Sequence, residues 1–131
     1  YIVGGSNLEK LIEEGKVESP AIDKILEKKL LPLITRGVDA IALGCTHYPF
    51  IRKKIEIKVK RKAQIYDSGG AVAGHVKHVL IAEKLLSSNR VKDEFYTTND
   101  PTKFKIIAKK LLVAYLGSDK FRVDSARKAI I

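Results

Sequence analysis

The fold is decided by residues 38–50, VDAIALGCTHYPF. Residues 38–44 are apolar except for Asp39, and glycine stands at both ends of the run. A short apolar run between turn residues is typical of a strand buried on both faces of a parallel sheet. The side chains that follow this run are polar or reactive: Cys45, Thr46 and His47. The stretch therefore predicts a buried strand that leads into a loop able to carry chemistry.

Helical patterns precede this strand. Ser19 and Pro20 begin a run in which apolar residues recur at helical spacing until Gly37. Further upstream, a shorter helix is capped by Asn7 or Ser6 and ends at Gly15. A helix that leads closely into a buried strand is typical of an α/β fold. We therefore expect a three-layer α/β lobe with a mostly parallel sheet flanked by helices.

Further elements are predicted after the loop. Residues 51–62 combine strand-like alternation with helical spacing, and we interpret them as a short helix before a strand at 63–66. The turn DSGG at residues 67–70 opens a third helix. Its expected core side consists of aliphatic residues: Val72, Val76, Val79 and Leu80.

The last elements are a short strand and a long helix. Residues 95–97 are expected to form the strand. Asp100 caps the helix, Pro101 begins it and Gly117 ends it. Its apolar residues recur at helical spacing: Phe104, Ile107, Ala108, Leu111, Leu112 and Tyr115.

The composition is that of a single globular domain, with 131 residues, 45% hydrophobic and 31% charged. No apolar run approaches the ~20 residues of a membrane helix, and no signal-peptide pattern is present, so we expect a cytoplasmic protein without a membrane partner. The net charge of +10 is compatible with a nucleic acid partner, with an anionic substrate, or with a lysine-rich surface that has no binding role. The sequence contains no methionine, so we interpret the chain as a fragment or a processed product.

Cys45 is the only cysteine, so it forms no internal disulfide and cannot by itself build a multi-thiolate metal site. Its place, between a strand and a helix, is where open α/β sheets bind ligands and where helix amides favour a thiolate. An exposed helix end contributes only about 0.3–1 kcal/mol to a nearby charge. We therefore expect His47 to exchange the thiol proton and Thr46 to donate to an anionic group. A buried thiol and a structural imidazole have the same spacing, so spacing alone leaves both interpretations open.

Longer strings around this loop resemble one known family. GCTHYP follows VDAIAL, LIEEGKVESP precedes it, and IYDSGGAVA and FYTTND come after it. In this order the strings resemble the C-terminal half of glutamate racemase, over most of the chain. Related aspartate racemases usually carry a glutamate where His47 stands, so this histidine favours the glutamate enzyme.

The resemblance implies an isomerase that interconverts L- and D-glutamate without a cofactor or a metal. The D-glutamate would serve bacterial peptidoglycan synthesis, and with it cell wall biogenesis and cell shape. Cys45 matches one of two catalytic cysteines, His47 assists its proton transfer, and Thr46 and His47 contact the substrate. Glu13 matches an auxiliary acidic catalytic residue. Removal of an α-proton creates carbanion character beside a carboxylate, which suits a thiolate base with amide and hydroxyl donors.

The resemblance also implies two lobes with the active site between them. Residues 1–66 match a remnant of the second lobe with the GCTHYP loop, and residues 67–131 match a segment that packs on the first lobe. The first lobe carries the other cysteine, which this sequence lacks. We therefore expect the chain to be inactive alone unless a homodimer or the missing N-terminal lobe completes it. Such a half-site would exchange the α-proton of one enantiomer without inverting it.

Two other interpretations remain open. The stretch from Arg52 to Lys62 has seven cations opposed only by Glu56, which suits phosphate binding and makes a nucleic-acid-binding module the rival function. No aromatic residue is interleaved with these charges, which favours a solvated lysine-rich face. The third interpretation is a catalytically inert racemase-like remnant.

Overall fold

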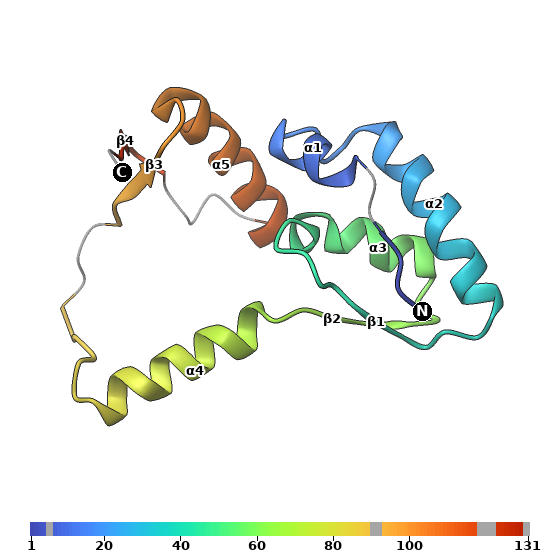
Figure 1. Ribbon diagram of the computed structural model, residues 1–131, viewed down its shortest axis with the longest axis horizontal. Helices are drawn as coiled ribbons and strands as arrows, with labels where there is room; N and C mark the ends of the chain where they lie inside the picture. The colour runs from blue at the N-terminus through green and yellow to red at the C-terminus, as the bar shows by residue number, and fades with distance from the viewer. Residues whose placement is uncertain (5–6, 90–92, 118–122, 130–131) are drawn as a thin grey trace.

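The protein is described by a computed structural model over residues 1–4, 7–89, 93–117 and 123–129 (Figure 1). Its helices are α1 (Leu8–Glu13), α2 (Pro20–Thr35), the 3₁₀ helix η1 (Tyr48–Ile51), α3 (Arg52–Val59), α4 (Gly69–Ala82) and α5 (Pro101–Leu116). Its strands are β1 (Ala40–Ala42), β2 (Gln64–Tyr66), β3 (Phe95–Thr97) and β4 (Ala126–Lys128). The expected α/β class with parallel strands is confirmed.

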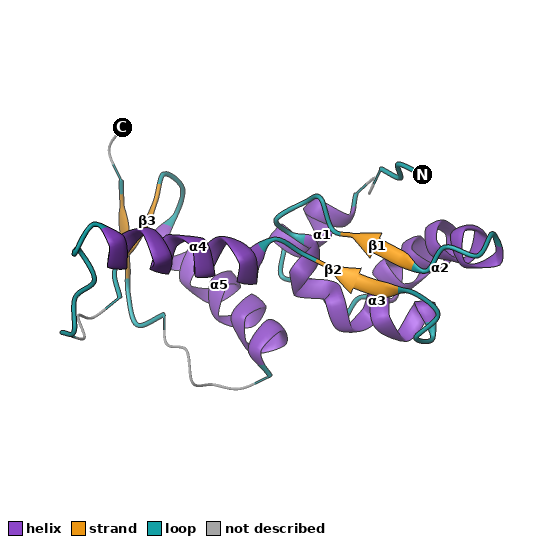
Figure 2. Ribbon diagram, turned by 90° about the horizontal axis from the view of Figure 1, so that it is seen from below, coloured by secondary structure: helices purple, strands orange, loops and turns teal. Residues whose placement is uncertain are grey.

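The strands form two small parallel sheets, one of β1 and β2 and the other of β3 and β4. Figure 2 shows them in different parts of the molecule, each beside helices. The first sheet pairs Ile41 with Ile65, and the chain between its strands carries η1 and α3. The second sheet uses the expected strand at 95–97 and a partner, β4, that the sequence analysis did not predict.

The burial expected for the first strand is wrong. Ala40 and Ala42 are exposed and Ile41 is half-buried, because only one face of β1 turns toward the helices. A continuous apolar run is typical of a strand that is covered on both faces, which is why burial was expected. In the part of the chain that the structure describes, the second face of β1 is accessible to solvent.

The hydrophobic core lies among α1, α2, α3 and β2. Its buried members are Leu8, Ile12, Val17, Ile22, Leu26, Leu30, Ile51, Ile55, Val59, Ala63 and Ile65. All of them fall within residues 1–66, the first of the two proposed domains. This core fixes the positions of α1 and of the loop after β1.

The helix ends in this region follow the expected local signals. The Ser19 side chain accepts a hydrogen bond from the Ala21 amide, and Pro20 begins α2. Gly15 and Gly37 end the first two helices with φ angles of 68° and 78°, a left-handed conformation that glycine adopts without strain. Asn7 holds the N-cap position of α1 but makes no capping hydrogen bond through its side chain. The alternative cap, Ser6, lies outside the described residues.

α4 lies apart from the core, as Figure 1 shows. The expected core side is therefore wrong: Val72, Val76 and Val79 are 56%, 50% and 42% exposed, and Leu80 alone is half-buried. Helical spacing puts these side chains on one face, but burial also needs another element to cover that face.

α5, in contrast, packs against η1, where the Phe50 and Tyr115 rings meet edge to face at 6.0 Å. Its limits were predicted correctly. The Asp100 carboxylate accepts hydrogen bonds from two amides of the first turn, and Gly117 ends the helix with a φ of 65°. Within the described residues, no helix combines the length and apolar character needed to cross a membrane.

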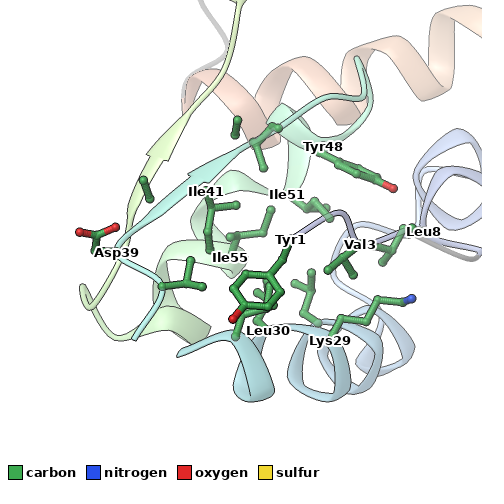
Figure 3. Close-up of a pocket in the computed structure, with 17 residues that line it drawn as sticks. Tyr1, Val3, Leu8, Lys29, Leu30, Asp39, Ile41, Tyr48, Ile51 and Ile55 are labelled. Carbon is green, nitrogen blue, oxygen red and sulfur yellow. The ribbon is translucent and has the colours of Figure 1, made fainter. Parts of the chain in front are cut away.

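A pocket that is open to solvent lies between β1 and α2. Its volume is about 490 Å³, and Ile41, Ile51 and Ile55 are among its lining side chains. Figure 3 shows Tyr48 at its edge, with the hydroxyl directed away from Ile41. Cys45 does not line this pocket, so the pocket is not the site of the thiol.

Candidate active site

The GCTHYP motif follows β1 directly, as the sequence predicted, and its last two residues, Tyr48 and Pro49, begin η1. The backbone carbonyl of Cys45 accepts a hydrogen bond from the Tyr48 amide at 3.2 Å, which makes the loop a tight turn. Cys45 is half-buried in this turn and Thr46 is exposed. The following helix is the short η1, which leads into α3.

Three of the expected site residues are joined in a row. The Cys45 Sγ lies 3.5 Å from His47 Nδ1, and His47 Nε2 lies 3.1 Å from Glu13 Oε1. Cys45 and His47 come from the loop, whereas Glu13 is the last residue of α1, 34 positions from His47. The structure thus brings Glu13, the auxiliary acidic residue expected from the family resemblance, into contact with the histidine.

The hydrogen-bonding capacity of these groups assigns the histidine tautomer. An ionised carboxylate only accepts hydrogen bonds, so His47 Nε2 carries the proton that is donated to Glu13. In the neutral ring, Nδ1 then presents its lone pair to the Cys45 thiol. The geometry suits transfer of the thiol proton to Nδ1, which leaves a thiolate beside an imidazolium that Glu13 stabilises.

The row of groups runs from the protein toward solvent. The His47 side chain is 31% exposed and that of Glu13 is 66% exposed. Both line a groove of about 780 Å³ whose other wall includes Phe95, Phe104 and Ile107 from β3 and α5. Cys45 and Thr46 do not line this groove, so the groove reaches the outer end of the row and not the thiol.

A second contact, which was not predicted from the sequence, joins the start of η1 to α1. The Tyr48 hydroxyl donates a hydrogen bond of 2.5 Å to Glu9 Oε1. This bond lowers the pKa of Glu9, while burial, and then the bond to Glu9, raise the pKa of Tyr48. The one usable signal was that Glu9 and Glu13 are four residues apart in a helix and therefore share a face.

Stability in acid is expected to depend on this second contact. Because the pKa of Glu9 in the folded chain is below its ordinary value of 4.5, the ionised carboxylate stabilises the fold above that pH. This contribution is lost as the pH falls through the lowered pKa. Tyr48→Phe removes the main cause of the lowered Glu9 pKa. As the pH falls from about 5 to about 3, the free energy of unfolding of this variant should therefore decrease less steeply than that of the unmodified chain. Urea unfolding across this range measures the slope.

Tyr96→Phe is the matched control, because it removes an exposed Tyr-to-Glu hydrogen bond, from Tyr96 to Glu94. We expect the control to keep the acid dependence of the unmodified chain. Equal slopes for Tyr48→Phe and the unmodified chain would show that Glu9 is not stabilised by Tyr48.

The basic stretch is partly neutralised by carboxylates from other elements. Arg52 binds Asp67 and the Ile65 carbonyl in addition to Glu56 on its own helix. Among the described residues, α3 also forms ion pairs through Lys54, with Glu18 and Asp23, and through Lys58, with Glu27. These ion pairs connect α3 with α2 and with the turn after β2. They favour a structural role for the cations of α3 over phosphate binding.

In the described part of the chain, no group of three or more His, Cys, Asp and Glu side chains is arranged to hold a metal ion.

The chain is similar in sequence to curated glutamate racemases. One from Pseudomonas entomophila is 35% identical over 114 residues, which are 86% of this chain and 42% of that protein. One from Clostridium kluyveri is 42% identical over 87 residues, which are 66% of this chain and 34% of that protein. This chain therefore spans only 34–42% of the length of these relatives. No family model matches it.

The fold is similar to solved glutamate racemases. The enzyme from Thermus thermophilus, in complex with β-chloro-D-alanine, has a TM-score of 0.70 at 28% identity over 93% of this chain and 44% of that chain. The RacE1 isoform from Bacillus anthracis has a TM-score of 0.70 at 23% identity over 95% of this chain and 44% of that chain. The enzyme from Francisella tularensis, in complex with D-glutamate, has the same TM-score at 22% identity. The last two likenesses concern the fold alone.

Proposed function

Because this chain matches one part of the glutamate racemases in sequence and fold, we propose that its GCTHYP loop is half of a racemase site. In this half-site Cys45 exchanges the α-proton of glutamate without a cofactor. The observation that carries the proposal is the row of Cys45, His47 and Glu13, joined at 3.5 and 3.1 Å. A thiol that only fills space needs neither an imidazole acceptor nor a carboxylate behind it.

The proposed reaction begins with transfer of the thiol proton to His47 Nδ1. The Cys45 thiolate then removes the α-proton of glutamate, and the resulting negative charge spreads into the substrate carboxylate. Thr46, exposed in the same turn, supplies a hydroxyl and an amide for that carboxylate. His47 and Glu13 connect the sulfur with solvent, so that a solvent proton can replace the one removed.

Inversion needs a proton donor on the opposite face of the α-carbon. The 131 residues contain one cysteine, so the two-cysteine mechanism needs a second one from outside these residues. A second copy of this chain or the first lobe would supply it. The proposed substrate is glutamate, and the curated glutamate racemases that this chain matches at 35% and 42% identity support that choice. We place the product in cytoplasmic peptidoglycan synthesis.

The test is to incubate the chain with L-glutamate and, separately, with D-glutamate in deuterated water. α-Deuterium incorporation and optical rotation are followed together. We expect deuterium in one enantiomer only, without inversion. Inversion in both directions would mean that a second copy supplies the opposite base, which size measurement in solution would reveal. No incorporation into either enantiomer would contradict the proposal and leave an inert racemase-like remnant.

A further inference from the structure

We propose that Tyr48 and Glu9 are a positioning pair that holds Glu13 against His47. The inference rests on the proposed function, because it concerns the row of groups behind Cys45. The Tyr48 hydroxyl binds Glu9, and the Cys45 sulfur binds His47 instead, so the proposed role of the pair is to position the carboxylate and not to react.

The geometry makes the two contacts neighbours. His47 and Tyr48 are consecutive in the loop, and Glu9 and Glu13 are one helical turn apart on α1. The loop residues therefore bind the two carboxylates side by side, His47 to Glu13 at 3.1 Å and Tyr48 to Glu9 at 2.5 Å. If α1 rotates or slides, both contacts change together.

The two contacts differ in strength. The Glu13 side chain is 66% exposed, so water competes for it and its bond to His47 gains little by itself. Tyr48 and Glu9 are half-buried, and a hydroxyl bound to a carboxylate is one of the stronger kinds of hydrogen bond. The pKa of Glu9 is lowered and that of Tyr48 is raised, so this donor and this acceptor persist across the neutral range.

The helix needs such a support. α1 has six residues and no side-chain cap at its start, and isolated helices of this length are unstable in water. Leu8 and Ile12 anchor one side of α1 in the core. The Tyr48 bond fixes the adjacent, polar flank, about 100° around the helix, and with it the direction of Glu13.

The test measures the tautomer of His47 and not the reaction. In mildly alkaline buffer, nitrogen-15 spectra distinguish a ring protonated on Nε2 from one protonated on Nδ1. The chain has three histidines, and the exposed His75 and His78 on α4 serve as internal references. We expect Nε2–H to dominate at His47. Tyr48→Phe and Glu9→Ala should each lower the ratio of Nε2–H to Nδ1–H about five-fold.

The controls separate positioning from general damage. Glu9→Gln keeps an acceptor oxygen for Tyr48, so the ratio of Nε2–H to Nδ1–H at His47 should stay close to that of the unmodified chain. Glu13→Ala removes the acceptor of His47 and should lower this ratio as far as Tyr48→Phe does. Tyr96→Phe should not change it. The α1 methyl signals of Leu8 and Ile12 report whether the helix stays packed in each variant.

An unchanged His47 tautomer in both Tyr48→Phe and Glu9→Ala would overturn the inference, provided that Glu13→Ala shifts it. An unchanged tautomer in Glu13→Ala would overturn it as well, because the bond being positioned would not exist. Failure of the proposed function is a separate result: deuterium exchange would then be absent while the tautomer still responds to Tyr48.

Discussion

Exchange of the α-proton of glutamate should fall at least about 100-fold when Cys45 is replaced by Ala. The substitution removes the thiol of Cys45, the only cysteine in the sequence, and with it the proposed base. The measurement is the initial rate of deuterium incorporation into the enantiomer that the unmodified chain exchanges. Unchanged exchange in Cys45→Ala would show that the base is another group.

The residues behind the thiol should have graded effects. His47→Gln removes the proton acceptor of Cys45, and we expect a loss approaching that of Cys45→Ala. Glu13→Ala should reduce exchange about 10-fold, since water can partly replace a carboxylate that is 66% exposed. Glu14→Ala is the matched control, because this neighbouring carboxylate binds Lys16 and not the histidine. A loss in Glu14→Ala equal to that in Glu13→Ala would attribute both losses to α1 as a whole.

The second large effect concerns stability. Ile55→Ala should lower the free energy of unfolding by about 2–5 kcal/mol, because the side chain is 3% exposed and its removal leaves a cavity in the core. That loss is a large part of the ~5–15 kcal/mol that stabilises an ordinary domain. Urea unfolding followed by circular dichroism measures the difference.

Ile57→Ala is the matched control in the same helix. Its side chain is 71% exposed, so the same substitution should change the free energy by less than about 0.5 kcal/mol. Equal losses at the two positions would contradict the placement of α3, because they would mean that both faces of the helix are buried.

Much of the fold could be predicted because its signals are local. Ser19 and Pro20 begin α2, Asp100 and Pro101 begin α5, and Gly117 ends it, each through contacts within one helical turn. The strand at 63–66 was predicted within one residue. β4 was missed, since its partner β3 lies about 30 residues earlier and a strand this short has no pattern of its own.

In the candidate site, too, local sequence predicts some contacts, whereas the packing of α1 decides the others. The closeness of Cys45 and His47 follows from their separation by two residues, and their place after a strand follows from the apolar run before them. Glu13 was expected only from the family resemblance, and the distances that join it to His47 come from the packing of α1. The Tyr48 contact to Glu9 had no counterpart in the sequence analysis.

By itself, the sequence of this protein determined where most helices begin and end, which strand leads into the GCTHYP motif, and which thiol that motif carries. Capping, glycine conformation and short-range spacing act between residues a few positions apart. Only the tertiary structure decided which apolar faces are covered, with α5 packed on η1 and α4 exposed, and which carboxylates of α1 meet the loop. Burial and hydrogen bonding across the fold depend on elements brought together in space, and helical or strand periodicity does not identify those partners.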